Sequence, residues 1–284
     1  MIPAHQEEHS IGGLLAALAP LSADTEIIVV CNGCRDRTAE VARTVAPWAT
    51  VLDLPTGSKP AALDAGDAAA TSFPRMYLDA DVRIDAAAVS LMFAAVRGEP
   101  AAPDGPSVPG GLDAAAASPT YDLAGASWLV RSHQRFWQRL PANRHGLAGT
   151  NAMTVSRAGR ARFTRWPALI GDDYFLDGLF GPAEKARIPA AIVTRPTSRR
   201  FRDCISRKAR IHQGNRDIRT AGLRTVHTGG GAGGIAVVLR REPGAIVDLP
   251  AHLIVTVAAR LLSWWRRRRG TSGVWFRDGS RRKT

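Results

Sequence analysis

Through the first hundred residues, short apolar runs alternate with segments whose apolar positions recur at helical spacing. The runs predict strands and the segments predict helices. The predicted strands are residues 26–31, 50–54 and 75–79. The predicted helices are residues 36–46, 58–70 and 85–97, opened by the capping residues Asp36, Ser58 and Asp85 and with Gly98 as the stop. This alternation predicts an α/β fold with a doubly wound, mostly parallel sheet flanked by helices.

The pattern changes after this region. Residues 98–112 are rich in Pro and Gly and predict an internal boundary. Beyond them the sequence predicts two helices, a flexible Gly-rich linker and a final amphipathic helix. These elements are expected near residues 127–139 and 203–216, at 228–234, and near 250–268. The chain is therefore expected to fall into residues 1–97, 98–227 and 228–284.

The first residues also carry strand character. Ile2, Pro3 and Ala4 resemble the last residues of a first strand, and only four residues precede His5. That is too few for the central strand that a sheet of this kind needs. We therefore expect a truncated or misassigned start, with an upstream in-frame extension rich in Val and Ile. A stop codon immediately upstream would contradict this expectation.

Charge is unevenly distributed over the 284 residues. Hydrophobic residues make up 45% of the chain, enough for a sizeable core, and the net charge is +13. Residues 199–224 hold nine Lys and Arg against two Asp, and residues 251–284 hold nine against one. The rest is close to neutral. Anionic partners are therefore expected at these two segments, nucleotide phosphates at the first and a lipid surface at the second. No nucleic acid partner is expected.

Cysteine content and hydropathy bear on the compartment. Three cysteines do not build a disulfide framework, which favours a reducing compartment. Pro3 and the acidic pair Glu7–Glu8 follow Met1 too closely for a visible signal peptide. No run of about 18 uncharged apolar residues occurs, so no membrane-spanning helix is expected. The sequence predicts a cytoplasmic protein.

Two carboxylates stand directly after the third predicted strand. Asp79 and Asp81 flank Ala80 where the apolar run Met76-Tyr77-Leu78 gives way to a loop. Ligands of open α/β sheets bind outside the carboxyl ends of the strands. Carboxylate oxygens there suit Mg²⁺ or Mn²⁺, which leave coordination positions open for substrate phosphates. A cation in this place would neutralise a diphosphate leaving group, which points to nucleotide-sugar chemistry.

Four segments, in order and at suitable spacing, resemble those of family 2 glycosyltransferases with the GT-A fold. Residues 2–8 resemble I-P-A-x-N-E-E, and residues 26–38 resemble E-I-I-V-V-D-D-G-S-x-D-x-T. Residues 57–66 resemble G-K-x-x-A-L-N-x-G, and Tyr77-Leu78-Asp79-Ala80-Asp81 resembles the metal motif. The resemblance implies transfer of a sugar from a nucleotide-diphosphate sugar to an acceptor glycan, lipid or small molecule. It implies that residues 1–97 bind the donor and that residues 98–227 bind the acceptor and carry out catalysis.

The resemblance also assigns residues to the donor. Asp81 would be the main ligand of Mg²⁺ or Mn²⁺, and Asp79 would contact the ribose or the metal. Lys59 would lie near the nucleotide, although a solvated lysine at a helix start has the same local pattern. The base and ribose pocket would be lined by Pro3, Ala4, Glu8 and Asn32. Cys31-Asn32 stands where the family has an acidic pair, and Asp64 where it has Asn, so the base is not specified.

Two later segments, residues 149–153 and 171–173, resemble acceptor-side segments of the family. The resemblance makes Asp173 the general base that takes the acceptor hydroxyl proton in an inverting transfer, with Asp172 beside it. An acidic helix start would produce the same pattern. Arg207 and Arg210 are candidates for clamping the diphosphate, because Arg matches phosphate geometry; a solvated basic face is the alternative. The Q-x-x-R-W motif of processive members is absent, which favours transfer of a single sugar.

Other functions also match parts of the sequence. His5, Glu8 and His9 fit the H-x-x-E-H pattern of inverted zinc peptidases, which requires an established helix. Cys31 and Cys34 form a C-x-x-C that fits either a redox pair or two unpaired thiols. A sugar-nucleotide pyrophosphorylase would need a Gly-rich basic opening loop that the chain lacks. If the first strand is missing, a noncatalytic, membrane-associated nucleotide-binding relative is the alternative to an enzyme.

The final helix combines apolar residues with a basic end. Trp264 and Trp265 precede four consecutive arginines, Arg266–Arg269. Tryptophan at headgroup depth beside an arginine cluster is typical of helices at an anionic bilayer surface. A terminal helix packed on the protein, with a solvated basic end, would show the same sequence. A peripheral position on the inner face of the membrane is therefore an expectation that needs a test. Residues in 98–148, including His133, Arg135 and His145, are either acceptor ligands or surface residues.

Overall fold

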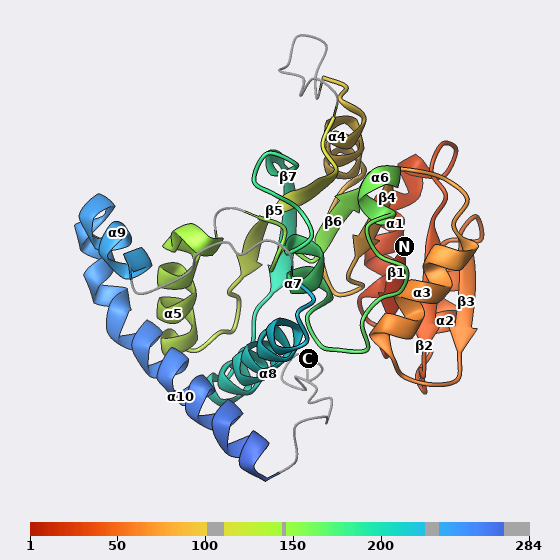
Figure 1. Ribbon diagram of the computed structural model, residues 1–284. Helices are drawn as coiled ribbons and strands as arrows, with labels where there is room; N and C mark the ends of the chain where they lie inside the picture. The colour runs from red at the N-terminus through yellow and green to blue at the C-terminus, as the bar shows by residue number, and fades with distance from the viewer. Residues whose placement is uncertain (101–110, 144–145, 225–232, 270–284) are drawn as a thin grey trace. The chain divides into compact units, whose positions relative to one another are not determined.

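The computed structural model describes residues 1–100, 111–143, 146–224 and 233–269 (Figure 1). The chain forms two compact units whose segments interleave along the sequence. Unit 1 comprises Met1–Thr120, Leu147–Ala168 and Leu179–Arg195. Unit 2 comprises Tyr121–Gly146, Leu169–Gly178 and Pro196–Thr284.

Seven strands and ten α-helices are defined among the described residues. The strands are β1 (Ile2–Ala4), β2 (Ile28–Asn32), β3 (Thr50–Leu54), β4 (Arg75–Leu78), β5 (Ala114–Asp122), β6 (Ala152–Val155) and β7 (Lys185–Pro196). The α-helices are α1 (Ile11–Leu18), α2 (Thr38–Val45), α3 (Lys59–Ala69), α4 (Ala86–Arg97), α5 (Trp128–Arg139), α6 (Arg157–Arg160), α7 (Asp172–Asp177), α8 (Phe201–Thr220), α9 (Gly233–Arg241) and α10 (Leu249–Arg268). Three short 3₁₀ helices are η1 (Ala19–Leu21), η2 (Pro141–Asn143) and η3 (Pro243–Asp248).

The first three strands form a parallel sheet in the order β1-β2-β3. Ile2 is opposite Val29, and Ile28 is opposite Thr50. Met1 joins this sheet to β4, because its amino group donates to the Met76 carbonyl at 2.7 Å and its carbonyl accepts from Leu78 N at 3.0 Å. The strand that begins at Ile2 therefore lies between β2 and β4. Its three residues, which the sequence predicted to be the end of a strand, do form one.

The remaining strands form a second, four-stranded sheet in the order β4-β6-β5-β7. β6 runs antiparallel to both β4 and β5. The predicted α/β class, with a parallel sheet flanked by helices, is confirmed, and β6 makes the complete arrangement mixed. The alternation of strand and helix that supported the prediction ends at residue 97. The antiparallel pairs of β6 with β4 and β5 involve residues beyond that point, so the alternation did not predict them.

In the first hundred residues, capping residues and apolar runs predicted the positions of helices and strands that the structure contains. β3 matches the predicted strand, and α4 covers residues 86–97. Ser58 Oγ accepts from Ala61 N at 3.3 Å and Asp85 Oδ1 from Ala88 N at 2.8 Å, as expected of capping residues. Gly98 ends α4 with a left-handed φ of 77°, a conformation in which a side chain is disfavoured.

The sheet extends across the boundary that the sequence suggested at residues 98–112. β4 precedes that segment, whereas β5 and β6 follow it, and β4 and β6 are hydrogen-bonded neighbours. Unit 1 therefore contains residues from both predicted halves. Residues 101–110 of this segment, 225–232 of the predicted linker region and the tail from residue 270 lie outside the described residues.

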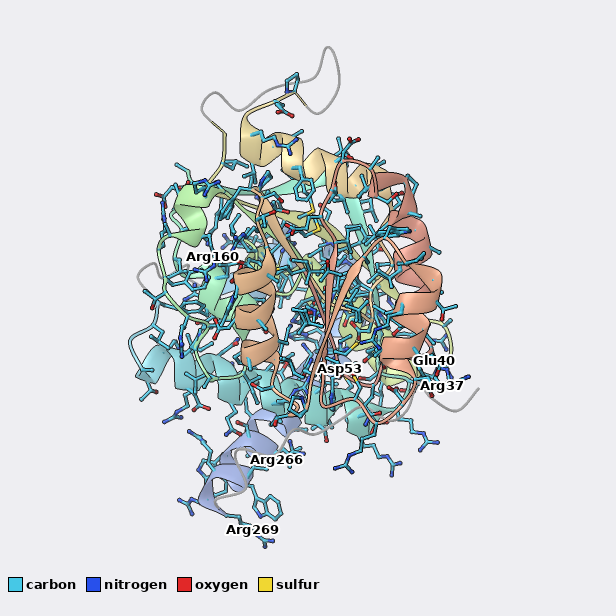
Figure 2. The ribbon with its side chains drawn as sticks, turned by 90° about the vertical axis from the view of Figure 1, so that its right-hand side faces the viewer. Arg37, Glu40, Asp53, Arg160, Arg266 and Arg269 are labelled. Carbon is cyan, nitrogen blue, oxygen red and sulfur yellow. The ribbon has the colours of Figure 1, made fainter. Side chains whose placement is uncertain are left out.

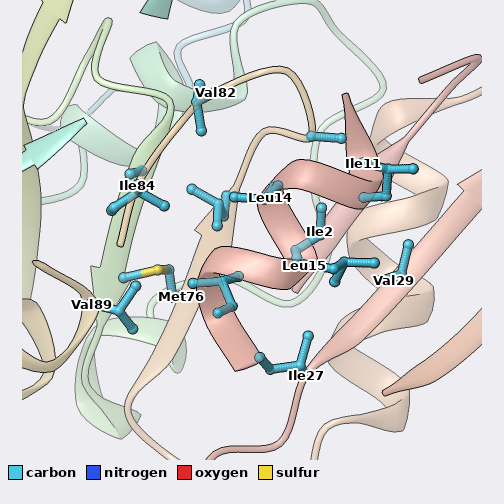
Figure 3. Close-up of a cluster of buried hydrophobic side chains, with 14 of the residues drawn as sticks. Ile2, Ile11, Leu14, Leu15, Ile27, Val29, Met76, Val82, Ile84 and Val89 are labelled. Carbon is cyan, nitrogen blue, oxygen red and sulfur yellow. The ribbon is translucent and has the colours of Figure 1, made fainter. Parts of the chain in front are cut away.

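One apolar cluster holds unit 1 together (Figure 3). Ile2 and Val29 from the parallel strands pack with Leu15 from α1, Met76 from β4 and Val89 from α4. All are at most 6% exposed. Burial of side chains of this size stabilises the folded state by about 1.5–3 kcal/mol each. The cluster fixes α1, α4 and the strands in unit 1 and so sets where the strands end.

Unit 2 is built from helices, with α10 packed along α5 and α8 (Figure 1). His133 of α5 is fully buried and stacks on His252 of α10 with ring centroids 5.0 Å apart. Burial holds the pKa of the His252 imidazole at about 4, so it is neutral at neutral pH. Arg135 is hydrogen-bonded to Asp248 at 2.6 Å. His133 is therefore a core residue, while His145 lies outside the described residues.

One expectation about membranes needs correction. Pro243–Arg268, which comprises η3 and α10, is a helical stretch of 26 residues with a window of mean hydropathy 1.7. By length and composition it is long enough to cross a bilayer, contrary to the sequence-based expectation. Asp248 and Arg260 interrupt the uncharged run, which is why a search for an unbroken apolar stretch missed it. A third of that window (33%) is buried inside the protein.

Candidate functional site

The loops that follow β1, β2 and β3 meet at the carboxyl edge of the parallel sheet. Asn32, which is 4% exposed, donates from its side chain to the Ala4 carbonyl at 2.8 Å. His5 Nδ1 lies 2.5 Å from the Asn32 carbonyl oxygen. Gly33 has a φ of +59°, and a Cβ there would overlap the backbone of Gly57. The three loops are thus in direct contact, at the edge where ligands of such sheets bind.

Glu8 ties the loop after β1 to the start of α2. Its carboxylate accepts from Arg37 N at 3.0 Å, and its own backbone nitrogen lies 3.5 Å from an Asp36 oxygen. Asp36 in turn accepts from Thr38 N at 3.2 Å. Glu8 is partly exposed, at 26% of its side chain. Its position beside the loop junction allows a polar contact with a ligand, and the same contacts stabilise the entry into α2.

Pro3 and Ala4 end β1, but they differ in what they can offer a ligand. Pro3 is half-buried, whereas the Ala4 side chain is fully buried in the core cluster of unit 1. The Ala4 carbonyl already accepts from Asn32. Ala4 can therefore contribute backbone atoms and shape, and its side chain faces the core.

Asp79 is held from two sides directly after β4. Lys59 Nζ, at the start of α3, lies 2.6 Å from Asp79 Oδ1. Asn151 donates from its side-chain amide to Asp79 Oδ2. Lys59 and Asp79 are both about one-quarter exposed, at 23% and 26%. Lys59 is therefore not merely a solvated residue at a helix start; it orients the first carboxylate of the D-x-D motif.

Asn151 was not expected at this place. It has a left-handed backbone, with φ 62°, which asparagine tolerates better than most residues. Its carbonyl also accepts from Asp79 N at 3.0 Å, so it holds both the backbone and the side chain of that residue. The resemblance had placed Asn151 in an acceptor-side segment. The contact joins positions 72 apart in the sequence, which no local pattern predicts.

Asp81 lies two residues further along the same loop. It is partly buried, between the buried side chains of Ala80 and Val82. A two-way backbone pairing of Arg83 with Thr194, at 2.8 and 2.9 Å, anchors the loop just beyond it. Lys59 and Asn151 hold the two oxygens of Asp79, and Asp81 adds a second carboxylate in the same partly exposed loop.

The donor set fits a hard divalent cation that is bound together with a substrate. Among the described residues, no group of three or more His, Cys, Asp or Glu side chains converges on one point. Mg²⁺ usually takes only one or two carboxylates, and substrate phosphates and water complete its octahedron. Two acidic residues in one partly exposed loop meet that requirement, whereas a structural zinc site would need four ligands.

Asp172 and Asp173 open α7 in unit 2. Both are half-buried, and Asp173 Oδ1 accepts from the next backbone nitrogen, that of Tyr174, at 2.7 Å. The same helix is anchored by Asp177, which pairs with buried Arg224 at 3.2 Å. The acidic helix start anticipated as the structural alternative is therefore present. It also holds the two carboxylates on a rigid element.

Arg207 and Arg210 both lie on α8 in unit 2 and are half-buried. Arg207 Nη1 donates to the Pro196 carbonyl at 3.3 Å, and the neighbouring Lys208 lies 4.7 Å from the Trp137 ring centroid. This side of α8 is therefore partly engaged in packing within unit 2. It is not a fully solvated basic face.

The zinc-peptidase pattern does not have the geometry that its chemistry needs. Residues 5–10 form a bend and a turn, and α1 begins only at Ile11. His5 contacts Asn32 and His9 is exposed, so the two imidazoles do not share a helical face. The pattern is a coincidence of residue order.

Cys31 and Cys34 are free cysteines at the loop after β2. Burial and the neighbouring Cys34 raise the pKa of the Cys31 thiol to about 12. A thiol that stays protonated at neutral pH is a poor nucleophile. The interpretation as two unpaired thiols therefore fits the structure better than a redox pair does.

Unit 1 also contains a cavity of about 100 Å³ away from this loop cluster. Residues at the amino ends of β1, β2 and β4 line it, among them Met1, Glu26 and Arg75. Ligands of open α/β sheets bind at the opposite, carboxyl edge. The cavity is therefore not assigned to the site formed by Asn32, Lys59, Asp79 and Asp81.

Comparison with known families agrees with this geometry. The family described as glycosyl transferase family 2 matches residues 1–158, which is more than half of the chain and includes every loop of the cluster at the sheet edge. No curated protein matches the sequence.

Several solved structures resemble the fold. A mannosyltransferase from Pyrobaculum calidifontis, in complex with GDP-Man and Mn²⁺, has a TM-score of 0.57 and 15% identity and covers 96% of this chain and 75% of its own. Glucosyl-3-phosphoglycerate synthase from Mycobacterium tuberculosis, with Mn²⁺, UDP-Glc and phosphoglyceric acid, has a TM-score of 0.52 and 17% identity over 78% of each chain. At these identities the likeness shows the fold, and the predicted GT-A-type architecture is confirmed.

Proposed function

The chain belongs to glycosyl transferase family 2, and from this premise we propose that it transfers a single sugar from a nucleotide-diphosphate sugar to an acceptor hydroxyl with inversion. The observation that carries the proposal is the loop after β4. Asp79 is fixed there by Lys59 and Asn151, and Asp81 stands beside it at the carboxyl edge of the sheet. Carboxylates at that edge suit a metal-assisted diphosphate leaving group.

In this proposal the donor nucleoside occupies the junction of the first three loops. Asn32 and the backbone of Ala4 form one wall, and Pro3 and Glu8 flank it. The hydrogen bond between Asn32 and Ala4 supports this role, because that wall of the pocket would already be ordered before the donor binds. A pre-ordered pocket loses less conformational entropy on binding than a mobile one. Lys59 orients Asp79 toward the ribose.

Mg²⁺ or Mn²⁺ would be held by Asp81, with Asp79 as its neighbour, and when bound would neutralise charge developing on the departing diphosphate. The protein residues have a separate task, which is to orient these carboxylates. Asn151 and Lys59 do so for Asp79 through charge-assisted hydrogen bonds. Arg207 and Arg210 are proposed to clamp diphosphate oxygens.

Inversion requires a base that receives the acceptor proton. We assign this role to Asp173, with Asp172 beside it. The acceptor oxygen then attacks the anomeric carbon, its proton passes to the Asp173 carboxylate, and the bond between that carbon and the diphosphate breaks. Support comes from the order of the motifs and from the position of Asp173 at the start of α7, a helix whose last residue, Asp177, pairs with buried Arg224.

The proposal includes a division of labour and a location. Residues 1–97 bind the donor, residues 98–227 supply the acceptor side, and residues 228–284 form a C-terminal extension. The acceptor is a glycan, a lipid or a small molecule, and no nucleic acid takes part. The enzyme is cytoplasmic and lies peripherally on the inner face of the membrane, consistent with a role in cell-envelope polysaccharide synthesis.

A thermal-shift panel of nucleoside diphosphates with and without Mn²⁺ tests the donor assignment. One nucleotide is expected to raise the Tm in a Mn²⁺-dependent manner, because the cation links Asp81 to the diphosphate. Asp81→Ala removes the ligand, so calorimetry should show at least a tenfold loss of Mn²⁺-dependent affinity, equal to about 1.4 kcal/mol.

Glu99→Ala, at an exposed surface residue, is the matched control and should bind like the wild type. Intact Mn²⁺-dependent binding in Asp81→Ala would remove Asp81 from the metal site. Nucleotide binding by the wild type without transfer to any hydroxyl acceptor would favour the noncatalytic alternative.

Asn151→Gly tests the clamp on Asp79. Glycine keeps the left-handed backbone but removes the amide that donates to Asp79. A hydrogen bond to a charged group contributes about 1.5–3 kcal/mol to stability, so the Tm should fall by several degrees. Donor KM should rise roughly tenfold, a loss of about 1.4 kcal/mol, because Asp79 is no longer held in place. Asn143→Gly, which removes an amide bonded to the Trp137 carbonyl in unit 2, is the control. An unchanged donor KM would show that Asp79 does not depend on Asn151.

A further inference from the structure

The side of α10 that faces solvent is largely apolar from Leu253 to Trp265. Its exposed large apolar side chains are spaced one, three or four residues apart, and two more lie on η3. They are Ile246, Val247, Leu253, Ile254, Val257, Leu261, Trp264 and Trp265, with exposed fractions from 43% to 71%. This set is termed the outer face of α10. At 1.5 Å per residue, the 20 residues of the helix make it about 30 Å long.

The opposite side of α10 is occupied by the protein itself. Ala251, His252, Val255, Ala259 and Ser263 are buried, and the helix packs on α5 and α8 within unit 2 (Figure 1). Stacking of His252 on His133 and the burial of Asp248 at the start of the helix fix its rotation. The outer face is therefore a stable feature, presented by a helix that is already packed along its other side.

Positive charge accompanies the outer face, and no acidic residue lies between Asp248 and Asp278. Arg260 is exposed in the middle of the helix, and Arg266–Arg269 follow the tryptophans. Arg268 lies 4.1 Å from the Trp264 ring centroid and Arg269 lies 4.0 Å from that of Trp265. Figure 2 shows Arg266 and Arg269 at this end of the helix. Such pairs of tryptophan and arginine are typical of helices that lie where lipid headgroups meet acyl chains.

We propose that the outer face of α10 is the surface by which the protein binds a bilayer rich in anionic phospholipids, with the helix lying in the plane of the membrane. The inference rests on the membrane location given under the proposed function, and it names the surface and the lipid charge. Apolar side chains enter the acyl region while the arginines contact phosphate groups. Charge favours an anionic bilayer over a second copy of the chain as the occupant, since the outer face of another copy has no acidic residue to pair with these arginines.

The packing of α10 on the protein indicates that the helix lies on the membrane and does not cross it. A spanning helix would expose its whole circumference to lipid, including His252 and Ser263, which here face the protein. The central Arg260 would also lie at the middle of the bilayer, where an arginine is strongly disfavoured. In the plane of the membrane, Arg260 stays at headgroup level while Val257 and Leu261 insert.

Co-sedimentation of the full-length chain with phosphatidylcholine vesicles, with and without 30% phosphatidylglycerol, tests the proposal. We expect binding to the anionic vesicles at least tenfold stronger than to pure phosphatidylcholine, with a blue shift of tryptophan emission. The double variant Val257→Ser/Leu261→Ser should weaken binding at least tenfold, and Arg268→Gln/Arg269→Gln should abolish the preference for phosphatidylglycerol. Ile192→Ser, at an equally exposed apolar residue of β7 in unit 1, is the matched control and should bind normally.

Three outcomes would overturn the proposal. The first is equal binding to neutral and anionic vesicles, or no binding to either. The second is a dimer in light scattering that Val257→Ser/Leu261→Ser dissociates. The third is stronger quenching of tryptophan by lipids brominated near the bilayer centre than by those brominated near the headgroups, which would indicate a spanning helix. Nucleotide thermal shifts measured without lipid test donor binding independently of the membrane. A failure of the membrane proposal can therefore be distinguished from a failure of the proposed transferase function.

Discussion

Replacing Asp173 with asparagine is expected to lower turnover by about 10²- to 10⁴-fold, the usual contribution of a general base. Asparagine keeps the size of the side chain and its oxygen, so the contact with Tyr174 N can survive. It cannot take a proton from the acceptor hydroxyl. Donor affinity should remain, because Asp173 is not among the residues proposed to hold the donor. Steady-state transfer rates, together with calorimetry of nucleotide binding, measure the two effects separately.

The matched control for this variant is Glu40→Gln, which neutralises an exposed acidic residue in the first turn of another helix, α2 (Figure 2). It should leave turnover unchanged. A wild-type rate for Asp173→Asn would exclude Asp173 as the base. A joint loss of turnover and Tm would instead indicate that the carboxylate serves mainly to stabilise the start of α7.

Removal of the Asp67 side chain is expected to destabilise the protein by about 3–5 kcal/mol, as found when one partner of a buried ion pair is deleted. Asp67 lies on α3, with 5% of its side chain exposed. It accepts from Arg75 at 3.0 Å, Arg160 at 2.8 Å, Tyr77 at 3.0 Å and Trp166 at 2.9 Å. Asp67→Ala would leave two largely buried guanidinium groups without their carboxylate.

Urea denaturation followed by circular dichroism measures this loss, and the Tm should fall by about 10 °C. The control is Glu99→Ala, which removes an exposed carboxylate 3.9 Å from Arg97. Exposed pairs contribute about 0–1 kcal/mol, so its effect should be small. A loss below about 1 kcal/mol for Asp67→Ala would show that water replaces the carboxylate and that this network does not stabilise unit 1.

The fold of the first hundred residues could be predicted because its signals are local. Ser58 and Asp85 lie within three residues of the amides they cap, and Gly98 stops its own helix. The antiparallel strand β6 could not be predicted in this way. Its pairing with β4 joins residues that lie more than 70 positions apart, and the apolar run Ala152–Val155 is too short for its periodicity to separate a strand from a helix.

In the candidate site too, residues in local motifs could be predicted, whereas contacts between distant segments could not. The order of the motifs identified Lys59, Asp79 and Asp81, since each lies at the end of a strand or the start of a helix. It did not identify Asn151, or the way Asp67 joins α3 to Arg160 and Trp166. Hydrogen bonds between distant segments depend on three-dimensional packing. Asp172 and Asp173 belong to unit 2, so their role remains a prediction from resemblance and from the local geometry of α7.

The contact between Gly33 and Gly57 limits which substitutions the loop junction, the proposed donor pocket, can accept in engineering. A methyl group at position 33 would collide with the backbone at position 57, and a side chain at Gly57 would press against the His5 ring. Libraries that aim to accept a different nucleotide should therefore keep both glycines fixed. Such libraries should vary neighbouring positions whose side chains are exposed to solvent, such as Arg37.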